Sequence, residues 1–172
     1  MALRPAKCYR KLERPYTRQS RKKPRKSYVK GVPYPKITRF ETGKVKKKFG
    51  LTMHLVAVDE GQIRHNALEA TRVAANKVML EGAGEDGYFM KVLLYPHHVL
   101  RENALATGAG ADRFQTGMRK SFGKPIGTAA RVKKGQKLIE IRTNKSKKDF
   151  AKRALKIAAY KLPVKCRIAE AG

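Results

Sequence analysis

The side chains that could support acid–base or metal chemistry are few and scattered in this sequence. Its 13 acidic residues are thinly spread and form no evident pair of a general acid and a general base. His97 and His98 are adjacent at the end of an expected strand, where successive side chains point to opposite faces. With only Glu102 near them in sequence, they make a poor pair of metal ligands. We therefore expect neither a catalytic site nor a metal site at these histidines.

Thiol chemistry and phosphate-loop chemistry are also disfavoured. Cys8 and Cys166 lie far apart and belong to no CxxC pair, so we expect two free thiols in a reducing cytosol rather than a zinc site. The glycine-rich stretch in the middle of the chain has neither the GxxxxGK[ST] form of a P-loop nor the GxGxxG form of a dinucleotide fingerprint. The sequence thus predicts no bound cofactor and no enzymatic activity.

The dominant feature of the chain is its positive charge. Lys and Arg number 41 and Asp and Glu 13, which gives a net charge of +28 over 172 residues. Such a charge repels itself in a compact monomer and suits a protein that a polyanion neutralises. Nucleic acid is the first candidate, because phosphates offer many contacts and release counterions, and an anionic membrane surface is the alternative. Beside a nucleic acid, His97 and His98 would be structural or RNA-contacting residues.

Length and hydropathy favour one ordinary domain with a tail. Hydrophobic residues make up 41% of the chain, enough for a core. We find no run of about 18 apolar residues, which a membrane helix would need. Nor do we find the basic, apolar and small-residue layout of a secretory signal in this sequence. We therefore expect a cytosolic, soluble protein.

Residues 1–48 are predicted to form an extended basic arm that is loosely ordered alone. Residues 1–50 hold 18 of the Lys and Arg residues and five of the eight prolines, but only two acids, Glu13 and Glu41. Proline removes a backbone donor and biases its predecessor towards extended conformations. Aromatic rings among the cations suit stacking on bases as well as phosphate contact, and the alternative is a solvated, disordered tail. The tyrosines among these cations are Tyr9, Tyr16, Tyr28 and Tyr34.

Residues 49–172 are predicted to be a globular domain. An apolar, β-rich run at 51–58 predicts a strand. Asp59 and Gln62 have the spacing of a capping box before a helix over 60–81, which would end at Gly82. Residues at helical spacing predict its buried face, namely Ile63, Ala67, Ala70, Ala74 and Val78. A second row is expected to be exposed and consists of His65, Glu69, Arg72 and Asn76.

The second half of this domain repeats the order strand, helix, strand. Strands are expected over 88–95 and 137–142, followed by a helix over 147–161 with Ser146 as its cap. A last half-buried strand is predicted over 164–168, where apolar residues alternate with Lys165 and Arg167. The expected apolar face of the second helix consists of Phe150, Ala154, Leu155 and Ala158. The predicted fold class is α+β, with two helices on a mixed sheet.

A long loop between the expected strands, at about 97–132, does not fit an ordinary surface connection. Loops this long inside a domain are usually functional or disordered. Residues 103–111 read NALATGAGA, which is small and uncharged, whereas 112–131 are basic and contain Gly117, Gly123 and Gly127. Glycines allow close backbone approach to a ligand. The pattern favours a phosphate-contacting loop with a flexible neutral tip, and the alternative is a mobile surface loop.

Several segments together resemble one family. Residues 109–132 read AGADRFQTGMRKSFGKPIGTAARV, and this segment is similar to the signature of a universal large-subunit ribosomal protein family, called L-ten-e in archaea and eukaryotes and related to bacterial L-sixteen. RPAKCYR at 4–10, KGVPYPKI at 30–37 and ALEATRVAANKVM at 67–79 resemble the archaeal and eukaryotic branch. The short end after Ile168 favours an archaeal source.

The resemblance implies an α/β-hammerhead fold and a non-enzymatic role in translation. The chain would bind large-subunit rRNA near the peptidyl-transferase region. Its loop would face tRNA at the aminoacyl and peptidyl sites. Neighbouring large-subunit ribosomal proteins would be further partners, and neither a membrane nor a homo-oligomer is expected. The rival hypotheses are a chromatin-type general nucleic-acid binder and an enzyme that acts on RNA.

Two sets of site residues follow from the charge pattern and the resemblance. The residues expected to bind rRNA are Arg4, Lys7, Arg10, Lys11, Arg14, Arg18, Arg21, Lys22, Lys23, Arg25, Lys26, Lys30, Lys36, Arg39, Arg119, Lys120, Lys124 and Arg131. The residues of the expected tRNA-facing loop are Arg101, Asn103, Gly108, Ala109, Gly110, Ala111, Asp112 and Arg113.

Overall fold

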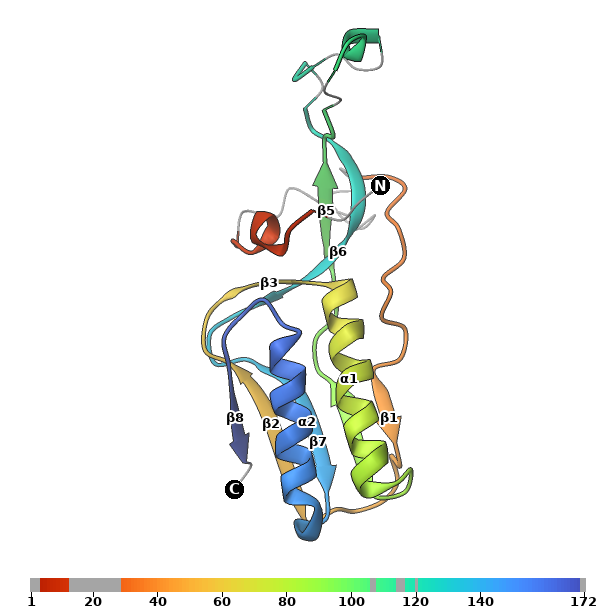
Figure 1. Cartoon of the computed structure of the whole chain (residues 1–172), viewed down its shortest axis with the longest axis vertical. Helices are drawn as coiled ribbons and strands as arrows, with labels where there is room; N and C mark the ends of the chain where they lie inside the picture. Colours follow the sequence, from red (N-terminus) through yellow and green to blue (C-terminus); the bar gives the residue numbers. More distant parts are fainter. Residues whose placement is uncertain (1–3, 13–28, 106–107, 114–116, 120, 171–172) are drawn as a thin grey trace, which may run out of the picture.

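A computed structural model describes residues 4–12, 29–105, 108–113, 117–119 and 121–170. Two helices lie side by side over one sheet, and a narrow hairpin projects from one end of this body (Figure 1). The strands are β1 Glu41–Gly43, β2 Leu51–Ala57, β3 Gly61–Arg64, β4 Tyr88–Val92, β5 His98–Glu102, β6 Lys124–Val132, β7 Lys137–Thr143 and β8 Cys166–Glu170. The α-helices are α1 His65–Ala83 and α2 Lys148–Tyr160, and short 3-10 turns cover Ala6–Tyr9, Ala111–Arg113 and Lys145–Lys147.

The strands form two sheets, one of five strands in the order β1-β4-β7-β2-β8 and one of three in the order β3-β6-β5. Every strand pair that the structure describes is antiparallel. The α+β class is confirmed, but the expected mixed sheet is wrong. The two strands joined by α1, β2 and β4, are parallel, and so are the two joined by α2, β7 and β8. In each case one other strand lies between them in the sheet. β7 fills the place between β2 and β4, and β2 fills the place between β7 and β8, so parallel strands are never neighbours here.

The core lies between the five-stranded sheet and the two helices. Leu55, Ile141 and Met90 on the sheet are fully buried, as is Leu155 on α2. The predicted apolar face of α2 is correct except at Phe150, which is 37% exposed. Its ring lies against α1 at Gly82, where an added Cβ would come within 2.1 Å of the Phe150 Cδ1 atom. The glycine predicted to end the first helix therefore lets the second helix pack closely.

The first helix begins later than predicted. Residues 61–64 form β3 rather than helix, and Gln62 donates its backbone N–H to the carbonyl of Arg10 instead of completing a capping box with Asp59. The helix continues past Gly82 to Ala83, with Gly84 as its C-cap at φ +71°. The inclusion of the strand residue Ile63 set the wrong phase for the apolar stripe. The residues that α1 buries are Leu68, Thr71, Ala75, Val78 and Met79, and Ala67 packs against the core partly buried, so the prediction is wrong at Ala70 and Ala74.

The row of α1 that was expected to be exposed is partly buried. Arg72 forms an ion pair with Glu69 at 2.6 Å between Nη2 and Oε1. Asn76 accepts a hydrogen bond from the hydroxyl of Tyr88, which is buried in β4. His65, the first residue of the helix, accepts a hydrogen bond at Nδ1 from the backbone N–H of Lys36. This row therefore connects α1 to other parts of the chain.

The predicted strands at 51–58 and 137–142 are confirmed as β2 and β7, and the predicted helix at 147–161 is confirmed as α2. Ser146 is no cap, because it lies inside the 3-10 turn and no side-chain hydrogen bond caps α2 within the described chain. β4 ends at Val92, earlier than predicted. β8 begins at Cys166, and its position at the sheet edge leaves Ile168 39% exposed instead of half-buried.

The predicted arm and loop both contain regular structure. Within the predicted arm, β1 pairs with β4, and Ile37 is only 1% exposed. Within the predicted loop at 97–132, β5 and β6 form a hairpin, so the connection itself covers residues 103–123. The strand at 124–132 was missed because Pro125, Gly127 and the small residues after it give little apolar alternation. No helix in the described part of the chain has both the length and the apolarity needed to cross a membrane.

Candidate nucleic-acid interface

The basic N-terminal segment, residues 4–12, lies on the three-stranded sheet. Gln62 of β3 donates its backbone N–H to the Arg10 carbonyl at 3.0 Å and its side-chain amide to the Lys11 carbonyl at 2.6 Å. Arg64 donates to the Arg4 carbonyl at 2.7 Å, and its guanidinium lies 5.7 Å from the centre of the Tyr9 ring. These contacts hold the backbone of the segment and leave most of its cationic side chains directed to solvent.

Glu102, at the end of β5, fixes the start of this segment. Its carboxylate forms an ion pair with Arg4 and accepts a hydrogen bond from the Tyr9 hydroxyl at 3.4 Å. The hydrogen bond and charge of Glu102 raise the pKa of Arg4, and burial together with that carboxylate raises the pKa of Tyr9. Arg4 was predicted to bind RNA, but its nearest anion is this carboxylate. It therefore serves at least in part as an internal anchor.

Gly61 allows the segment to lie close to β3. A Cβ atom added there would come within 2.9 Å of the Val164 Cγ1 atom and 3.2 Å of the Arg10 carbonyl oxygen. Any larger residue would have to displace the Val164 side chain or the Arg10 carbonyl. The sequence analysis placed this glycine inside a helix and so gave no role to it.

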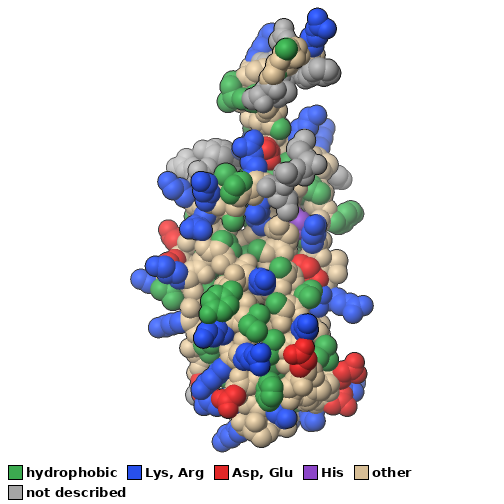
Figure 2. Space-filling model, in the orientation of Figure 1, with side chains coloured by type: hydrophobic (Ala, Val, Ile, Leu, Met, Phe, Trp, Pro, Cys, Tyr) green, Lys and Arg blue, Asp and Glu red, His purple; other side chains and the backbone are tan. Residues whose placement is uncertain are grey.

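Exposed cations from distant parts of the sequence meet beside this segment. Leu12 lines a surface cavity together with Arg131 of β6 and with Lys133 and Lys134 of the following turn. Figure 2 shows Lys and Arg side chains spread over both the helical layer and the projecting end of the visible face. The two lysines lie in the turn between β6 and β7 and were missed by the sequence analysis, although adjacent lysines directly before Gly135 are the pattern that could have identified them.

Arg101 joins the two sides of the projecting hairpin where the loop begins. We call this place, formed by Arg101, Glu102, Phe122 and Gly123, the neck. The Arg101 guanidinium lies 3.8 Å from the centre of the Phe122 ring and donates a hydrogen bond to the Phe122 carbonyl at 2.6 Å. Gly123, at φ +79°, follows directly, and an added Cβ there would come within 2.8 Å of the Glu102 backbone. Arg101 was predicted to face tRNA, and in this structure its guanidinium joins the two sides of the neck. The neck thereby sets the direction in which the loop leaves the body.

Beyond the neck, the described residues of the loop are mostly exposed. Gly108 and Gly110 adopt positive φ values of 129° and 80°, which glycine adopts with little strain. Arg113 and Arg119 are exposed, and so is Met118 at 66%. Residues 103–111 carry no charge in the sequence, whereas residues 112–131, the returning half of the hairpin, carry cations such as Arg113 and Arg119.

The described members of the predicted RNA-binding set are mostly exposed. Eight of them form no ion pair with another described residue, namely Lys7, Arg10, Lys11, Lys30, Lys36, Arg39, Arg119 and Lys124. Outside the described residues lie Arg14, Arg18, Arg21, Lys22, Lys23, Arg25, Lys26 and Lys120. The described cations occupy three places, which are the N-terminal segment, the segment before β1 and the returning half of the hairpin.

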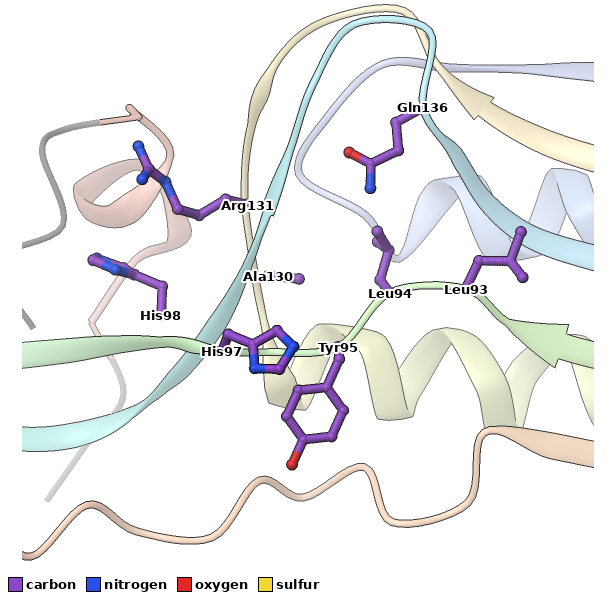
Figure 3. Close-up of a pocket in the computed structure, with 8 residues that line it drawn as sticks. All are labelled: Leu93, Leu94, Tyr95, His97, His98, Ala130, Arg131 and Gln136. Atoms are coloured by element: carbon purple, nitrogen blue, oxygen red, sulfur yellow. The ribbon is translucent and has the colours of Figure 1, made fainter. Parts of the chain in front are cut away.

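The histidines and cysteines are not assembled into a reactive centre. His97 is exposed and precedes β5, whereas His98 is in the strand, and their side chains point in different directions (Figure 3). Among the residues described, no group of three His, Cys, Asp or Glu side chains could hold a metal ion. Cys8 and Cys166 are free thiols, and burial raises the pKa of Cys166 to about 11, which keeps this thiol protonated.

Comparison with known proteins identifies the family. Residues 15–169 match the family described as ribosomal protein L16p/L10e. This chain belongs to the L16p/L10e family of ribosomal proteins. It is 52% identical over 169 residues to the large ribosomal subunit protein uL16 of Staphylothermus marinus, an alignment that covers 98% of this chain and 93% of the relative. The proteins of that name from Methanococcus aeolicus and Thermoplasma volcanium are 50% and 48% identical, with 98% of this chain covered and 94% and 92% of the relatives.

Membership of this family confirms the resemblance seen in the sequence. The chain is a ribosomal protein and not an enzyme. Its relatives named above are archaeal, in agreement with the resemblance to the archaeal and eukaryotic branch. The basic segment, the neck and the loop therefore belong to a protein whose family works in a ribonucleoprotein particle.

Proposed function

We propose that this chain is a structural constituent of the large ribosomal subunit that binds large-subunit rRNA near the peptidyl-transferase centre. In this proposal the cations of the N-terminal segment and of the returning half of the hairpin contact rRNA phosphates. The loop at 103–113 faces the tRNAs at the aminoacyl and peptidyl sites. Neighbouring ribosomal proteins complete the set of partners, and the protein works in the cytoplasm on the ribosome.

One observation carries the proposal more than any other. Exposed cations without a described acidic partner lie on the hairpin and around the N-terminal segment, while the stretch 103–111 is uncharged. Cations at the base suit permanent contact with rRNA phosphates, because phosphate contacts position a protein on its nucleic acid. A neutral tip suits a ligand that must arrive and leave, since it adds no strong electrostatic attraction. The α/β-hammerhead fold is part of this proposal, and two helices over an antiparallel sheet support it.

The first experiment is sedimentation of a cell lysate through a sucrose gradient, with and without ribonuclease, followed by immunoblotting for this chain. We expect near one-to-one migration with the large subunit, resistance to a high-salt wash and release by ribonuclease. Migration at the top of the gradient, or with DNA, would overturn the proposal in favour of a general nucleic-acid binder.

The tRNA-facing role of the loop needs a separate experiment. Replacement of residues 103–111 by a short turn should leave subunit assembly intact and impair translation. A Gly–Ser segment of the original length is the matched control, because it keeps the reach and neutrality of the loop, and it should retain most of the activity. Normal translation with the short turn would contradict the proposed role of the tip.

A further inference from the structure

Three aromatic rings lie in a series that leads from the core to the surface, the first pair stacked and the second pair tilted. Phe40 packs against the core, and the Tyr95 ring lies 5.4 Å from it between centroids at an interplanar angle of 25°. The His97 ring lies 4.4 Å from Tyr95 at 45°. Tyr95 is 49% exposed and His97 is exposed, so the series ends in solvent. We call Phe40, Tyr95 and His97 the ring ladder.

The backbone holds the ring ladder in place without any ligand. Val92 donates its N–H to the Phe40 carbonyl at 2.8 Å, which fixes Phe40 beside β4. Tyr95 and His97 flank Pro96, which is buried, and the His97 N–H donates to the Tyr95 carbonyl at 3.0 Å. Because these rings are already ordered, a ligand that stacks on them would lose little binding free energy to side-chain ordering.

A cavity of about 500 Å³ adjoins the outer end of the ring ladder. In Figure 3 the His97 ring lies beside Tyr95, whose side chain points away from Leu94, Ala130 and Gln136, the residues on the other side of the ribbon that also line the cavity. The side-chain oxygen Oε1 of Gln136 accepts a hydrogen bond from the backbone N–H of Lys133 at 2.9 Å, and the side-chain amide nitrogen is turned towards the cavity. The cavity thus combines apolar walls, an aromatic face and an oriented hydrogen-bond donor, the usual composition of a small-ligand site.

The charge around the ring ladder suits an anionic ligand. Lys36 and Arg39 are exposed on the segment that leads to Phe40. Arg131 also lines the cavity, and no acidic side chain lines it among the residues that the structure describes. Aromatic rings beside cations bind unpaired nucleotides, because the base stacks on the ring while the phosphates contact the cations.

We propose that the ring ladder and its cavity hold one unpaired base of rRNA. The base stacks on the outer face of His97 and receives a hydrogen bond from the Gln136 amide on its edge. Lys36 and Arg39 contact the phosphates on either side of that nucleotide. This inference rests on the proposed function, because it assumes that the chain binds rRNA, and it adds a base-binding site to what is otherwise contact with phosphates.

The test uses the full chain bound to large-subunit rRNA. The variants are His97→Ala, Tyr95→Ala and His97→Phe. Tyr160→Ala on α2 is the matched control, since Tyr160 is a tyrosine that is 74% exposed and distant from Tyr95 in the sequence. Affinity is measured over a range of salt concentrations, and the reactivity of each nucleotide to dimethyl sulphate is mapped in each complex. As Tyr95 and His97 lie at the surface, their replacement should leave the fold intact.

We expect the His97→Ala and Tyr95→Ala variants to bind about tenfold more weakly, which corresponds to about 1.4 kcal/mol. Because Tyr95→Ala removes no charge, the slope of the logarithm of the binding constant against the logarithm of the salt concentration should not change in this variant. One unpaired nucleotide should become reactive, and His97→Phe should restore its protection. Lys36→Gln and Arg39→Gln should instead reduce the slope by about 0.7 for each phosphate of a single strand that the variant leaves unneutralised.

The other outcomes separate this inference from the proposed function. If the ring variants bind as tightly as Tyr160→Ala and no nucleotide changes its reactivity, the base-binding site is wrong while rRNA binding stands. Changes confined to paired nucleotides, or occupation of the cavity by a neighbouring protein's side chain, would also overturn it. Failure of the wild-type chain to prefer rRNA over DNA would instead contradict the proposed function itself.

Discussion

The two sheets of this molecule are stabilised in different ways. The five-stranded sheet is covered by α1 and α2, and its inner residues, such as Leu55 and Ile139, are almost completely buried. The three-stranded sheet buries Ile63 and Val99, but polar contacts through Gln62 and Arg64 also fasten the N-terminal segment to it. One sheet therefore depends chiefly on apolar burial, and the other combines burial with hydrogen bonds to a segment rich in cations.

This difference suggests that the body supplies most of the stability, while the three-stranded sheet carries the segments proposed to bind rRNA. A rigid scaffold commonly presents binding residues on loops and exposed segments, where charge can remain solvated until a ligand arrives. Here the body supplies the scaffold, while the three-stranded sheet carries the hairpin and the basic segment (Figure 1). Changes in the body should then lower global stability, and changes around the small sheet should act locally.

The largest effect is expected in the body. Leu55→Ala removes a side chain that is 0% exposed between β2 and the helices. The resulting loss of buried area and the cavity left behind should lower the free energy of unfolding by about 2–5 kcal/mol. Ile126→Ala on the projecting hairpin, where Ile126 is 40% exposed, should cost about 1 kcal/mol or less. Thermal unfolding of both variants measures the contrast, and equal losses would mean that the two sheets share one mode of stabilisation.

A smaller effect is expected where the basic segment meets β3. Gly61→Ala places a Cβ between Val164 and the Arg10 carbonyl, so we expect a loss of about 1–3 kcal/mol. Hydrogen exchange of the Gln62 N–H should become faster, because its acceptor is displaced. Gly50→Ala is the matched control, since an added Cβ there meets nothing within 4 Å. Unchanged exchange at Gln62 would show that the segment can shift without breaking its hydrogen bond.

At the neck of the hairpin the effect should be local. Phe122→Ala removes the ring beneath Arg101, and an exposed cation–π contact contributes about 0.5–1 kcal/mol. Limited proteolysis within residues 103–123 should become faster while the melting temperature barely changes. Met118→Ala, which removes a 66% exposed side chain of the same loop, should leave proteolysis unchanged. A large fall in melting temperature with Phe122→Ala would show that the neck is part of the global fold.

The sequence predicted the body better than the small sheet, for a physical reason. β2, β7 and α2 have strong periodic apolar patterns because each buries one face against the core. β3, by contrast, is only four residues long and joins α1 directly, so its residues continued a helical pattern in the sequence. β6 begins with the largely exposed residues Lys124, Pro125 and Ile126, whose cation and proline resemble a loop. Short strands held by long-range pairing give too little local pattern to be recognised.

The candidate site also has a part that the sequence predicted and a part that it could not predict. Composition and family resemblance identified the exposed cations and the neutral stretch at 103–111. They could not show that Glu102 pairs with Arg4 or that Arg101 stacks on Phe122, because these partners are separated by 98 and 21 residues. Nor could they predict that Phe40 lies beside Tyr95. Contacts of this kind are set by the topology of the two sheets rather than by any local spacing.

The smallest predicted effect concerns pH at the junction of α1 and the segment before β1. Burial, with the charges of Lys36 and Arg64, lowers the pKa of His65, whose Nδ1 accepts the Lys36 N–H. In the unfolded chain the pKa of this histidine is about 6.5, so below that pH the unfolded state binds the proton more readily than the folded state. The folded state therefore keeps its full stability above about pH 6.5 and loses part of it as the pH falls towards the lower folded pKa.

NMR titration of the His65 ring should give a midpoint below 6.5. His65→Gln keeps a hydrogen-bond acceptor but does not titrate, so this variant should show a weaker dependence of unfolding free energy on pH between about 5 and 6.5. Because burial also lowers the pKa values of His54 and His98, some dependence should remain in the variant. An unchanged pH profile would mean that the Lys36 segment releases His65 without cost, and that this junction belongs with the exposed, adaptable parts of the molecule rather than with its body.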